Sequence, residues 1–164
     1  MTSIETTNVP NRAESRVLAI VPAYNEEESL VATIEELQRV APDIDYVVVN
    51  DGSRDGTLAL CKASGFNYVS HPTNLGLTAG VQTGMKYALR HGYEMAIQFD
   101  ADGQHDPAYI SSLVAKMDEA QADIVVGSRF VTEEKPKSLR MMGSNLISGM
   151  IKLTTGARIK DPTS

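Results

Sequence analysis

Two aspartates near the middle of the chain have the residue type and spacing of a metal site. Asp100 and Asp102 follow the apolar run 95–97 and lie two residues apart, so in an extended chain their side chains project to the same side. Two unpaired carboxylates about 4 Å apart repel each other by roughly 1 to 4 kcal/mol. Mg²⁺ and Mn²⁺ prefer oxygen ligands and also bridge phosphate oxygens, so either cation would relieve this repulsion. We therefore predict a Mg²⁺ or Mn²⁺ site at Asp100 and Asp102, with Gln104 adding a neutral oxygen.

A solvated acidic turn is the competing interpretation of the same stretch. Asp106 directly precedes Pro107, which suits the first turn of a helix, so for Asp106 we favour a helix cap. For His105 and His71 we favour structural roles, because no serine or cysteine nucleophile is arranged with either of them. The stretch is not an EF-hand, since its glycine stands at the fourth position and the twelfth position is not glutamate.

A second candidate site begins at Asp51, which opens the loop DGSRDG after the apolar run 46–49. In one interpretation its carboxylate accepts hydrogen bonds from a nucleobase or a ribose. In the other, Asp51 forms an Asx-type turn that only ends the strand. The sequence leaves these two interpretations open.

Short apolar runs that alternate with segments of helical period must position these residues. The runs typical of strands span residues 17–21, 46–49, 67–70, 95–99 and 124–126. Helical patterns cover residues 27–40, 58–63 and 78–90 and a segment that starts at Pro107. This alternation predicts a Rossmann-like, doubly wound α/β fold with a mostly parallel sheet and helices on both faces. Gly80 and Gly84 are expected to let their helix pack closely.

Polar residues gather directly after each predicted strand. The carboxyl ends of parallel strands meet at one edge of a sheet, where open α/β proteins bind their ligands, so we expect a single site there. Polar loops explain any one of the clusters well but explain five of them less well. The clusters are Tyr24-Asn25-Glu26, Asn50-Asp51-Gly52-Ser53, Asn74-Leu75-Gly76, Asp100-Ala101-Asp102 and Gly127-Ser128-Arg129.

The composition is that of one globular domain and excludes one class of partner. The 164 residues are 42% apolar and 22% charged, and the net charge of −6 comes without a basic stripe, so we expect no nucleic-acid partner. We expect residues 1–14 to form a flexible polar tail and residues 15–164 to form a single domain. The single cysteine, Cys61, forms no internal disulfide and is expected to be buried, which fits a reducing compartment.

The apolar segments of the chain bear on where the protein resides. No signal-like apolar stretch lies near the start, and nowhere do eighteen apolar residues follow one another, so we expect a cytoplasmic protein. The segment 139–153 is rich in Met, Leu and Ile and predicts a core helix. A peripheral role at the inner face of the plasma membrane is the alternative for this segment.

Five motifs, in order along the chain, resemble those of glycosyltransferase family 2. They are VPAYNEEESL, VVVNDGSRDGT, NLGLTAGVQTGMKYAL, FDADGQHDP and VVGSRF, and the resemblance covers nearly all of residues 17–164. It is greatest to the branch of dolichyl-phosphate mannosyltransferases and bacterial polyprenyl-phosphate sugar transferases. The resemblance implies a GT-A fold, a nucleotide-sugar donor and a divalent metal at a DxD motif, which here is Asp100-Ala101-Asp102.

The resemblance also implies roles for single residues. Asp100 would face the ribose or the sugar, and Arg129 would lie near the donor sugar or brace the loop. Asp102 and Gln104 would hold the metal on the diphosphate. The residues lining the nucleotide pocket beside the DxD motif would be Pro22, Tyr24, Glu26, Val49 and Asp51.

The branch is inverting, so the acceptor oxygen would attack the anomeric carbon as the metal-bound nucleoside diphosphate leaves. A polyprenyl phosphate is already an anion and needs no general base, whereas a hydroxyl acceptor would need one, for which Asp161 is the positional candidate. The chain departs from the family pattern in two places. Position 50 is Asn where many relatives carry an acid, and the chain stops inside the motif KDPTS that relatives continue, so it looks C-terminally truncated.

The function expected from these features is transfer of a hexose from a UDP- or GDP-linked donor to a polyprenyl or dolichyl phosphate or to a cell-surface glycan. The alternative is a truncated nucleotide-sugar-binding module without turnover. A nucleotidyltransferase of similar topology is disfavoured, because the chain lacks that class's Gly-rich, Lys/Arg-bearing phosphate loop. The sequence does not define the sugar, the base, the acceptor or the oligomeric state.

Overall fold

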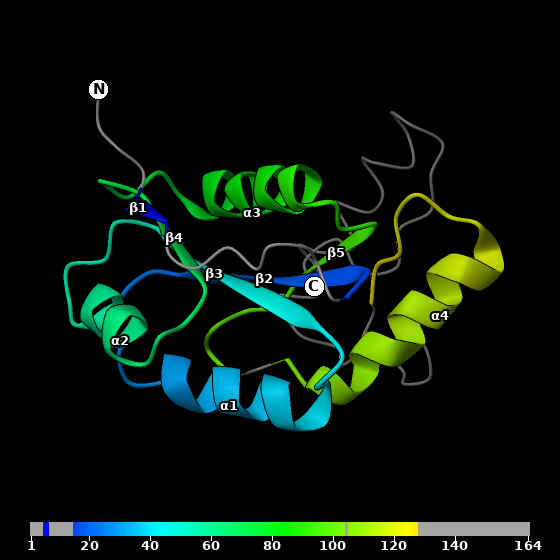
Figure 1. Ribbon diagram of the computed structural model, residues 1–164, viewed down its shortest axis with the longest axis horizontal. Helices are drawn as coiled ribbons and strands as arrows, with labels where there is room; N and C mark the ends of the chain where they lie inside the picture. Colours follow the sequence, from blue (N-terminus) through cyan, green and yellow to red (C-terminus); the bar gives the residue numbers. More distant parts are fainter. Residues whose placement is uncertain (1–4, 7–14, 104, 128–164) are drawn as a thin grey trace, which may run out of the picture. The chain divides into compact units, whose positions relative to one another are not determined.

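The structure is a computed structural model that describes residues 5–6, 15–103 and 105–127. The backbone divides into two compact units, Met1–Ser111 and Ser112–Ser164, and each is described by itself. The strands of the described residues all belong to the first unit, which therefore contains the sheet (Figure 1).

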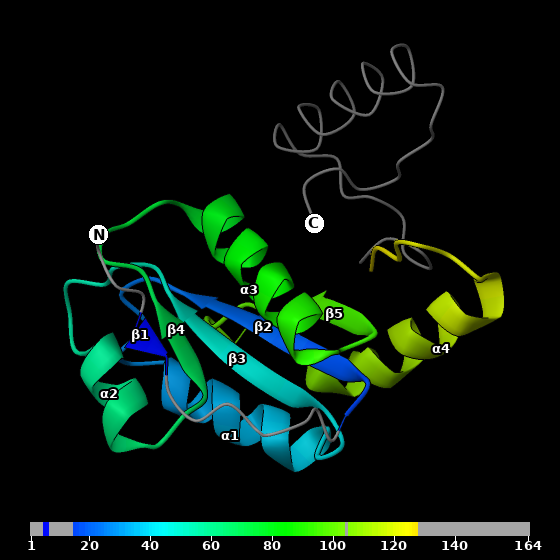
Figure 2. The same cartoon turned by 45° about the horizontal axis from the view of Figure 1, so that its top comes forward.

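The first unit is built on a sheet of five strands in the order β1-β4-β3-β2-β5. Four strands run parallel, and β1 (Glu5–Thr6) pairs antiparallel with β4 at one edge (Figure 2). This arrangement confirms the predicted mostly parallel sheet. The parallel strands are β2 (Val17–Ala23), β3 (Asp45–Asn50), β4 (Tyr68–Ser70) and β5 (Met95–Gln98).

The strand order contains a point at which the chain changes direction across the sheet. From β2 the chain goes to β3 and then β4 on one side, and later returns to pair β5 with the other side of β2. In open α/β sheets such a switch point leaves a crevice outside the carboxyl ends of the two strands that flank it. Here those strands are β2 and β5, so their following loops are the expected place for a ligand.

Helices cover both faces of the sheet in the first unit. Figure 1 shows α3 (Leu77–His91) on one face and α1 (Leu30–Val40) and α2 (Thr57–Ala63) on the other. This arrangement confirms the doubly wound α/β prediction. A last helical segment of this unit is the 3-10 turn η1 (Pro107–Tyr109), at the Pro107 start that the sequence indicated.

The core lies between these layers and explains why the strands form where they do. Residues 17–21 of β2 are almost fully buried, as expected for a central strand covered on both faces. A Cβ atom added at Gly84 would overlap the Ile20 side chain, whereas one added at Gly80 would meet only ordinary contacts. The close approach predicted for the helix therefore depends on Gly84. Cys61 is buried as predicted, and burial raises the pKa of its thiol to about 11.

In the second unit the described residues extend to Gly127. Helix α4 (Ile110–Ala120) starts at the end of the first unit and lies mostly in the second. It ends where Gln121 adopts a left-handed φ of 47°. The prediction of a strand over residues 124–126 is wrong: these residues form none, and Ile124 and Val126 are 79% and 68% exposed. A run of three apolar residues is too short to indicate a strand by periodicity alone.

Among the described residues, no helix has both the length and the hydropathy needed to cross a bilayer.

Candidate functional site

The loops that follow β2 and β3 are joined by hydrogen bonds between side chains and backbone. Asn25 adopts a left-handed φ of 59°, a conformation that Asn tolerates better than most residues. In this conformation its backbone N–H donates to Ser53 Oγ at 3.0 Å, and its Oδ1 accepts the N–H of Arg54 at 2.8 Å. Asn25 therefore fixes the first loop to the second from both its backbone and its side chain.

The next two residues continue this connection. The N–H of Glu26 donates to Thr57 Oγ1 at 2.9 Å, and the Glu27 carboxylate accepts the N–H of Gly56 at 2.5 Å. The N–H of Glu27 in turn donates to Asp55 Oδ2 at 3.2 Å. The motifs YNEEE and DGSRDGT thus bind each other residue by residue at the carboxyl edge of the sheet.

A shallow cavity of about 270 Å³ opens at this edge, within the first unit. Five of its seven lining side chains are carboxylates, so its donors are mainly hard oxygen atoms. The lining brings Asp102, which follows β5, together with the two joined loops. The lining residues are Asn25, Glu26, Glu27, Glu28, Ser29, Asp55 and Asp102.

The two aspartates of the DxD motif have different surroundings. Asp102 lines the cavity, but Asp100 does not. Gln98 Nε2 donates to Asp100 Oδ1 at 2.8 Å, and His105 Nε2 lies 3.7 Å from Asp100 Oδ2. The backbone N–H of Asp100 donates to His105 Nδ1 at 3.0 Å. Asp100 is thus held by its neighbours in the chain, with a side chain that is 37% exposed.

The backbone between these aspartates is anchored to α1. The Thr33 hydroxyl donates to the carbonyl of Ala101 at 3.0 Å, and Ala101 itself is buried. The position of Asp102 is therefore set by contacts of its neighbour with a helix of the core.

The residues that follow the motif have the structural roles predicted for them. Asp106 Oδ1 accepts the N–H of Ala108 at 2.9 Å and caps the turn that starts at Pro107, which confirms the predicted cap. The His105 ring packs edge-on against Phe99 with centroids 5.9 Å apart. His105 therefore braces the turn through Phe99 and Asp100.

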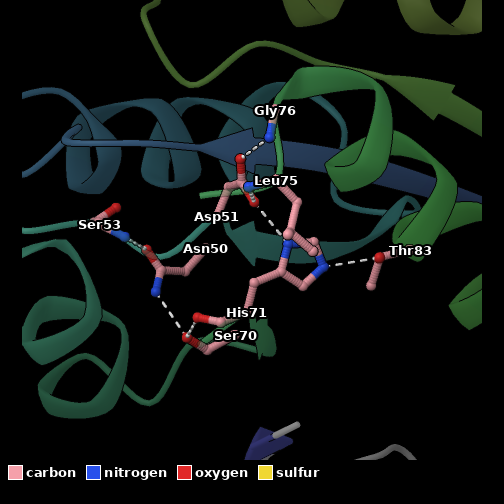
Figure 3. Close-up of polar contacts among 8 residues, drawn as sticks. All are labelled: Asn50, Asp51, Ser53, Ser70, His71, Leu75, Gly76 and Thr83. Carbon is pink, nitrogen blue, oxygen red and sulfur yellow. Dashed lines mark hydrogen bonds and ion pairs between the residues drawn. The ribbon is translucent and has the colours of Figure 1, made fainter. Parts of the chain in front are cut away.

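Asp51 lies at the centre of a second, buried group of polar contacts (Figure 3). Its Oδ1 accepts the N–H of Leu75 at 2.9 Å, and its Oδ2 accepts the N–H of Gly76 at 2.7 Å. Its Oδ1 also lies 2.7 Å from Nδ1 of His71. Burial raises the pKa of Asp51, but the hydrogen bonds from His71, Leu75 and Gly76 outweigh it, so the pKa lies below its ordinary value. Asp51 is therefore a buried carboxylate that links the end of β3 to the loop before α3.

Sequence reasoning did not find His71 as part of this group. The ring follows β4 directly, just as Asp51 follows β3, and its Nε2 lies 2.8 Å from Thr83 Oγ1 on α3. The position immediately after a predicted strand was the available signal. His71 lies outside the five polar clusters, so the cluster pattern does not indicate it.

Asn50, the last residue of β3, uses both ends of its side-chain amide. Its Nδ2 donates to Ser70 Oγ at 2.7 Å, and its Oδ1 accepts the N–H of Ser53 at 3.3 Å. An ionised carboxylate accepts hydrogen bonds but cannot donate one. The amide therefore satisfies one buried and one partly buried partner, and Asp51 is the first carboxylate of this loop.

The other predicted site residues are placed as follows. Tyr24 is exposed at the end of β2, whereas Val49 is fully buried in β3. Pro22 and Val49 both face Gly80 of α3, at 3.7 and 4.0 Å from a Cβ added there. Within the described ranges, no group of three or more His, Cys, Asp or Glu residues is arranged to hold a metal ion. Gln104, Arg129 and Asp161 lie outside the described residues.

An open α/β sheet with carboxylates and joined loops at the carboxyl ends of its strands defines the class of ligand-binding doubly wound proteins. The chain belongs to glycosyltransferase family 2: residues 18–163 match the family model described as "Glycosyl transferase family 2".

Curated relatives agree with this assignment. The chain is 36% identical over 126 residues to a polyprenol monophosphomannose synthase of Mycolicibacterium smegmatis, covering 73% of this chain and 47% of the relative. It is 35% identical over 136 residues to an undecaprenyl-phosphate mannosyltransferase of Micrococcus luteus, covering 77% of this chain and 55% of the relative. The chain thus spans about half the length of these relatives.

Solved structures agree in fold. A crystal structure of S. aureus TarS superposes with a TM-score of 0.54 at 22% identity, covering 74% of this chain and 38% of that chain. This similarity confirms the expected GT-A-like fold.

Proposed function

We propose that the protein is an inverting glycosyltransferase that moves a hexose from a UDP- or GDP-linked donor to a polyprenyl or dolichyl phosphate. Family membership supports glycosyl transfer, and the names of both relatives above contain mannose and a polyprenyl lipid. A cell-surface glycan is the other acceptor class in this proposal.

One observation carries the proposal. The acidic cavity lies at the carboxyl ends of β2 and β5, at the switch point of the sheet, and is formed by the joined loops together with Asp102. This is where an open α/β sheet binds a ligand. The diphosphate of the donor would lie at this edge, and the nucleoside would extend toward Pro22, Tyr24 and Asp51.

A divalent cation, Mg²⁺ or Mn²⁺, is part of the proposal. The donor set fits such an ion, because carboxylate oxygens dominate the cavity, and Mg²⁺ typically takes one or two protein carboxylates plus substrate phosphates. Asp102 would hold the ion, with Asp100 and Gln104 as further ligands. When bound, the ion supplies positive charge that stabilises the leaving nucleoside diphosphate.

Asp51 would contact the nucleoside. A carboxylate offers about four acceptor positions, and Asp51 uses three of them on His71, Leu75 and Gly76. The remaining acceptor position would receive a hydrogen bond from the base or the ribose. Because the pKa of Asp51 lies below its ordinary value, the group stays ionised and acceptor-only at neutral pH.

The acceptor decides whether a base is needed. The oxygen of a polyprenyl phosphate is already negative, so the chain's residues need only orient it toward the anomeric carbon. For a hydroxyl acceptor Asp161 would take the proton, and Arg129 would contact the donor sugar in either case. With a lipid acceptor, the protein would work in the cytoplasm at the inner face of the plasma membrane.

A second candidate is a nucleotide-sugar-binding module without turnover, because the carboxylates of the cavity account for binding of a metal and a diphosphate but do not by themselves transfer a sugar. Incubating the full chain with GDP-mannose, UDP-glucose or UDP-N-acetylglucosamine, Mn²⁺ and a short polyprenyl phosphate separates the two. The proposal predicts release of GDP or UDP that requires the lipid phosphate. Binding of a donor without any such release would favour the module.

A further inference from the structure

Both ring nitrogens of His71 are engaged in the interior of the first unit (Figure 3). Nδ1 lies 2.7 Å from Asp51 Oδ1, and Nε2 lies 2.8 Å from Thr83 Oγ1. The His71 side chain is 4% exposed and that of Asp51 is 5% exposed, so solvent takes little part in the contact between them, whereas the contact with Thr83 is partly buried. The His71 ring therefore connects the end of β4 to the end of β3, through Asp51, and to the middle of α3, through Thr83.

The chemistry of the two partners fixes the position of one proton. The Asp51 carboxylate also accepts two backbone N–H groups, and an ionised carboxylate has no proton to donate. His71 Nδ1 must therefore carry the hydrogen of the 2.7 Å contact. The Thr83 hydroxyl can then serve Nε2 as donor or acceptor.

The carboxylate held in this way fixes the loop before α3. Leu75 and Gly76 donate their backbone N–H groups to Asp51, and Gly76 directly precedes the first residue of α3 with a left-handed φ of 89°. A Cβ atom added at Gly52, next to Asp51, would overlap the backbone of Thr73 and lie 2.6 Å from Asn74 N. The loop 73–76 is therefore closed against the loop after β3 with no spare room.

The same order of carboxylate, imidazole and hydroxyl occurs in hydrolytic triads, but there the hydroxyl faces a bound substrate, which the cavities beside this group do not place at Thr83 or His71. The acidic cavity is not lined by His71 or Thr83. Nor does either residue line the apolar groove beside α3, which is formed by Leu77, Thr78, Val81, Gln82, Met85 and Gln98. A role in holding Asp51 is the one that the geometry leaves.

We propose that His71 is a positioning residue for the nucleotide site: its Nδ1–H holds the Asp51 carboxylate in the orientation that closes the loop 73–76 and presents the remaining acceptor position to the nucleoside. This inference rests on the proposed function, since it assigns Asp51 to the nucleotide. In this proposal nucleotide affinity depends on the N–H donor at Nδ1 of His71, although His71 itself does not contact the nucleotide.

Two variants of similar size separate the donor from the bulk of the ring. In His71→Asn the side-chain Nδ2 follows Cγ as Nδ1 does in histidine, so it can donate to Asp51, whereas His71→Leu fills the space without a donor. Leaving a buried charged acceptor short of one partner lowers nucleotide affinity by about tenfold or more. We expect this loss of UDP or GDP affinity by calorimetry in His71→Leu, and we expect His71→Asn to remain within about threefold of the wild type.

Tyr87→Phe is the matched control. Tyr87 lies one turn beyond Thr83 on α3, is buried, and receives a hydrogen bond from Asn67 Nδ2 at 3.0 Å. Removing its hydroxyl should lower the Tm but leave nucleotide affinity unchanged. A loss of affinity in Tyr87→Phe equal to that in His71→Leu would mean that the effect is general destabilisation, and would overturn the inference.

A second readout needs no nucleotide. Amide hydrogen exchange at Leu75 and Gly76 in the free protein should be faster in His71→Leu and close to wild type in His71→Asn. If the wild type binds a nucleotide and the two variants behave alike in affinity and exchange, the inference is wrong and the proposed function stands. If the wild type binds none of the nucleotides, the proposed function fails and the inference fails with it.

Discussion

The carboxylate of Glu27 accepts the backbone N–H of Gly56 at 2.5 Å, across two loops that lie 29 residues apart in the sequence. The reverse bond, from the N–H of Glu27 to Asp55, crosses the same gap. These loops follow adjacent parallel strands, and Ala23 of β2 is in register with Asn50 of β3. The sheet therefore places the two loops at the same edge. There the carboxylates of Glu27 and Asp55 each accept a backbone N–H of the opposite loop.

The hydrogen bonds between the two loops predict a small but measurable loss of stability when Glu27 is replaced. Glu27→Ala removes the acceptor for Gly56 and should lower the free energy of unfolding by about 1 kcal/mol, because the bond is charge-assisted but exposed. Urea titration followed by circular dichroism measures it. Glu36→Ala is the control, since it breaks only the exposed ion pair with Arg39 and should cost about 0.5 kcal/mol or less. Equal losses in both variants would contradict the account of the joined loops.

The packing of α3 predicts opposite effects for two glycines one turn apart. Gly84→Ala forces a methyl group onto Ile20 and should destabilise the protein by about 1 to 3 kcal/mol. Gly80→Ala meets only ordinary contacts and gains helix propensity, so it should be neutral or stabilising by up to about 1 kcal/mol. Thermal unfolding of the two variants compares them directly, and a stable Gly84→Ala protein would refute the close approach of α3.

The buried carboxylate of Asp51 predicts a pH dependence of stability. Its folded pKa lies below its unfolded value of about 3.9, so its contribution is complete above that value and is lost as the pH falls through the folded pKa. Asp51→Asn should therefore cost about 1 to 3 kcal/mol at pH 7, and the difference from wild type should shrink below about pH 4. Urea unfolding at several pH values between 7 and 3 measures it. A difference that grows on acidification would reverse the assigned sign.

The metal assignment predicts different results at two aspartates of one turn. Asp102→Ala should abolish the Tm shift that Mn²⁺ produces in the presence of a nucleotide, because Asp102 lines the cavity. Asp106→Ala should retain that shift and lower stability by about 1 kcal/mol, because Asp106 caps a helical turn. If Asp106→Ala abolished the Mn²⁺-dependent shift and Asp102→Ala retained it, the assignment of Asp102 to the metal and of Asp106 to the cap would be wrong.

The parts of the fold that the sequence predicts are those marked by a hydrophobic periodicity or by a local residue signal, such as a glycine at a helix end. The runs 17–21 of β2 and 47–49 of β3 are apolar and buried, and the C-cap of α3 is Gly92, which has a left-handed φ of 80°. The sheet edge that carries the site followed from these elements, because polar residues come directly after each strand. The same reasoning failed at residues 124–126, where three apolar residues have no partner strand among the described residues.

The contacts within the site could not be predicted in this way. Asp51 and His71 are 20 residues apart, and Asn25 and Arg54 are 29 apart, so no periodicity connects them. Which of several polar side chains meet depends on strand register and on backbone conformation, such as the left-handed φ of Asn25. The sequence predicted that acidic residues gather at this edge. It did not predict that the Asp51 carboxylate contacts His71, whereas Asp102 lines the cavity.

Metal-dependent binding of a nucleotide sugar tests the central claim most directly. The Tm of the full chain is measured with GDP-mannose, UDP-glucose and UDP-N-acetylglucosamine, each with Mn²⁺ and with a chelator. At a hundredfold excess over Kd, binding stabilises the folded state by about 2.7 kcal/mol, so we predict a clear rise in Tm for at least one donor that disappears with chelator. A Tm that no donor raises in a metal-dependent way would contradict the assignment of the acidic cavity as a nucleotide-sugar site.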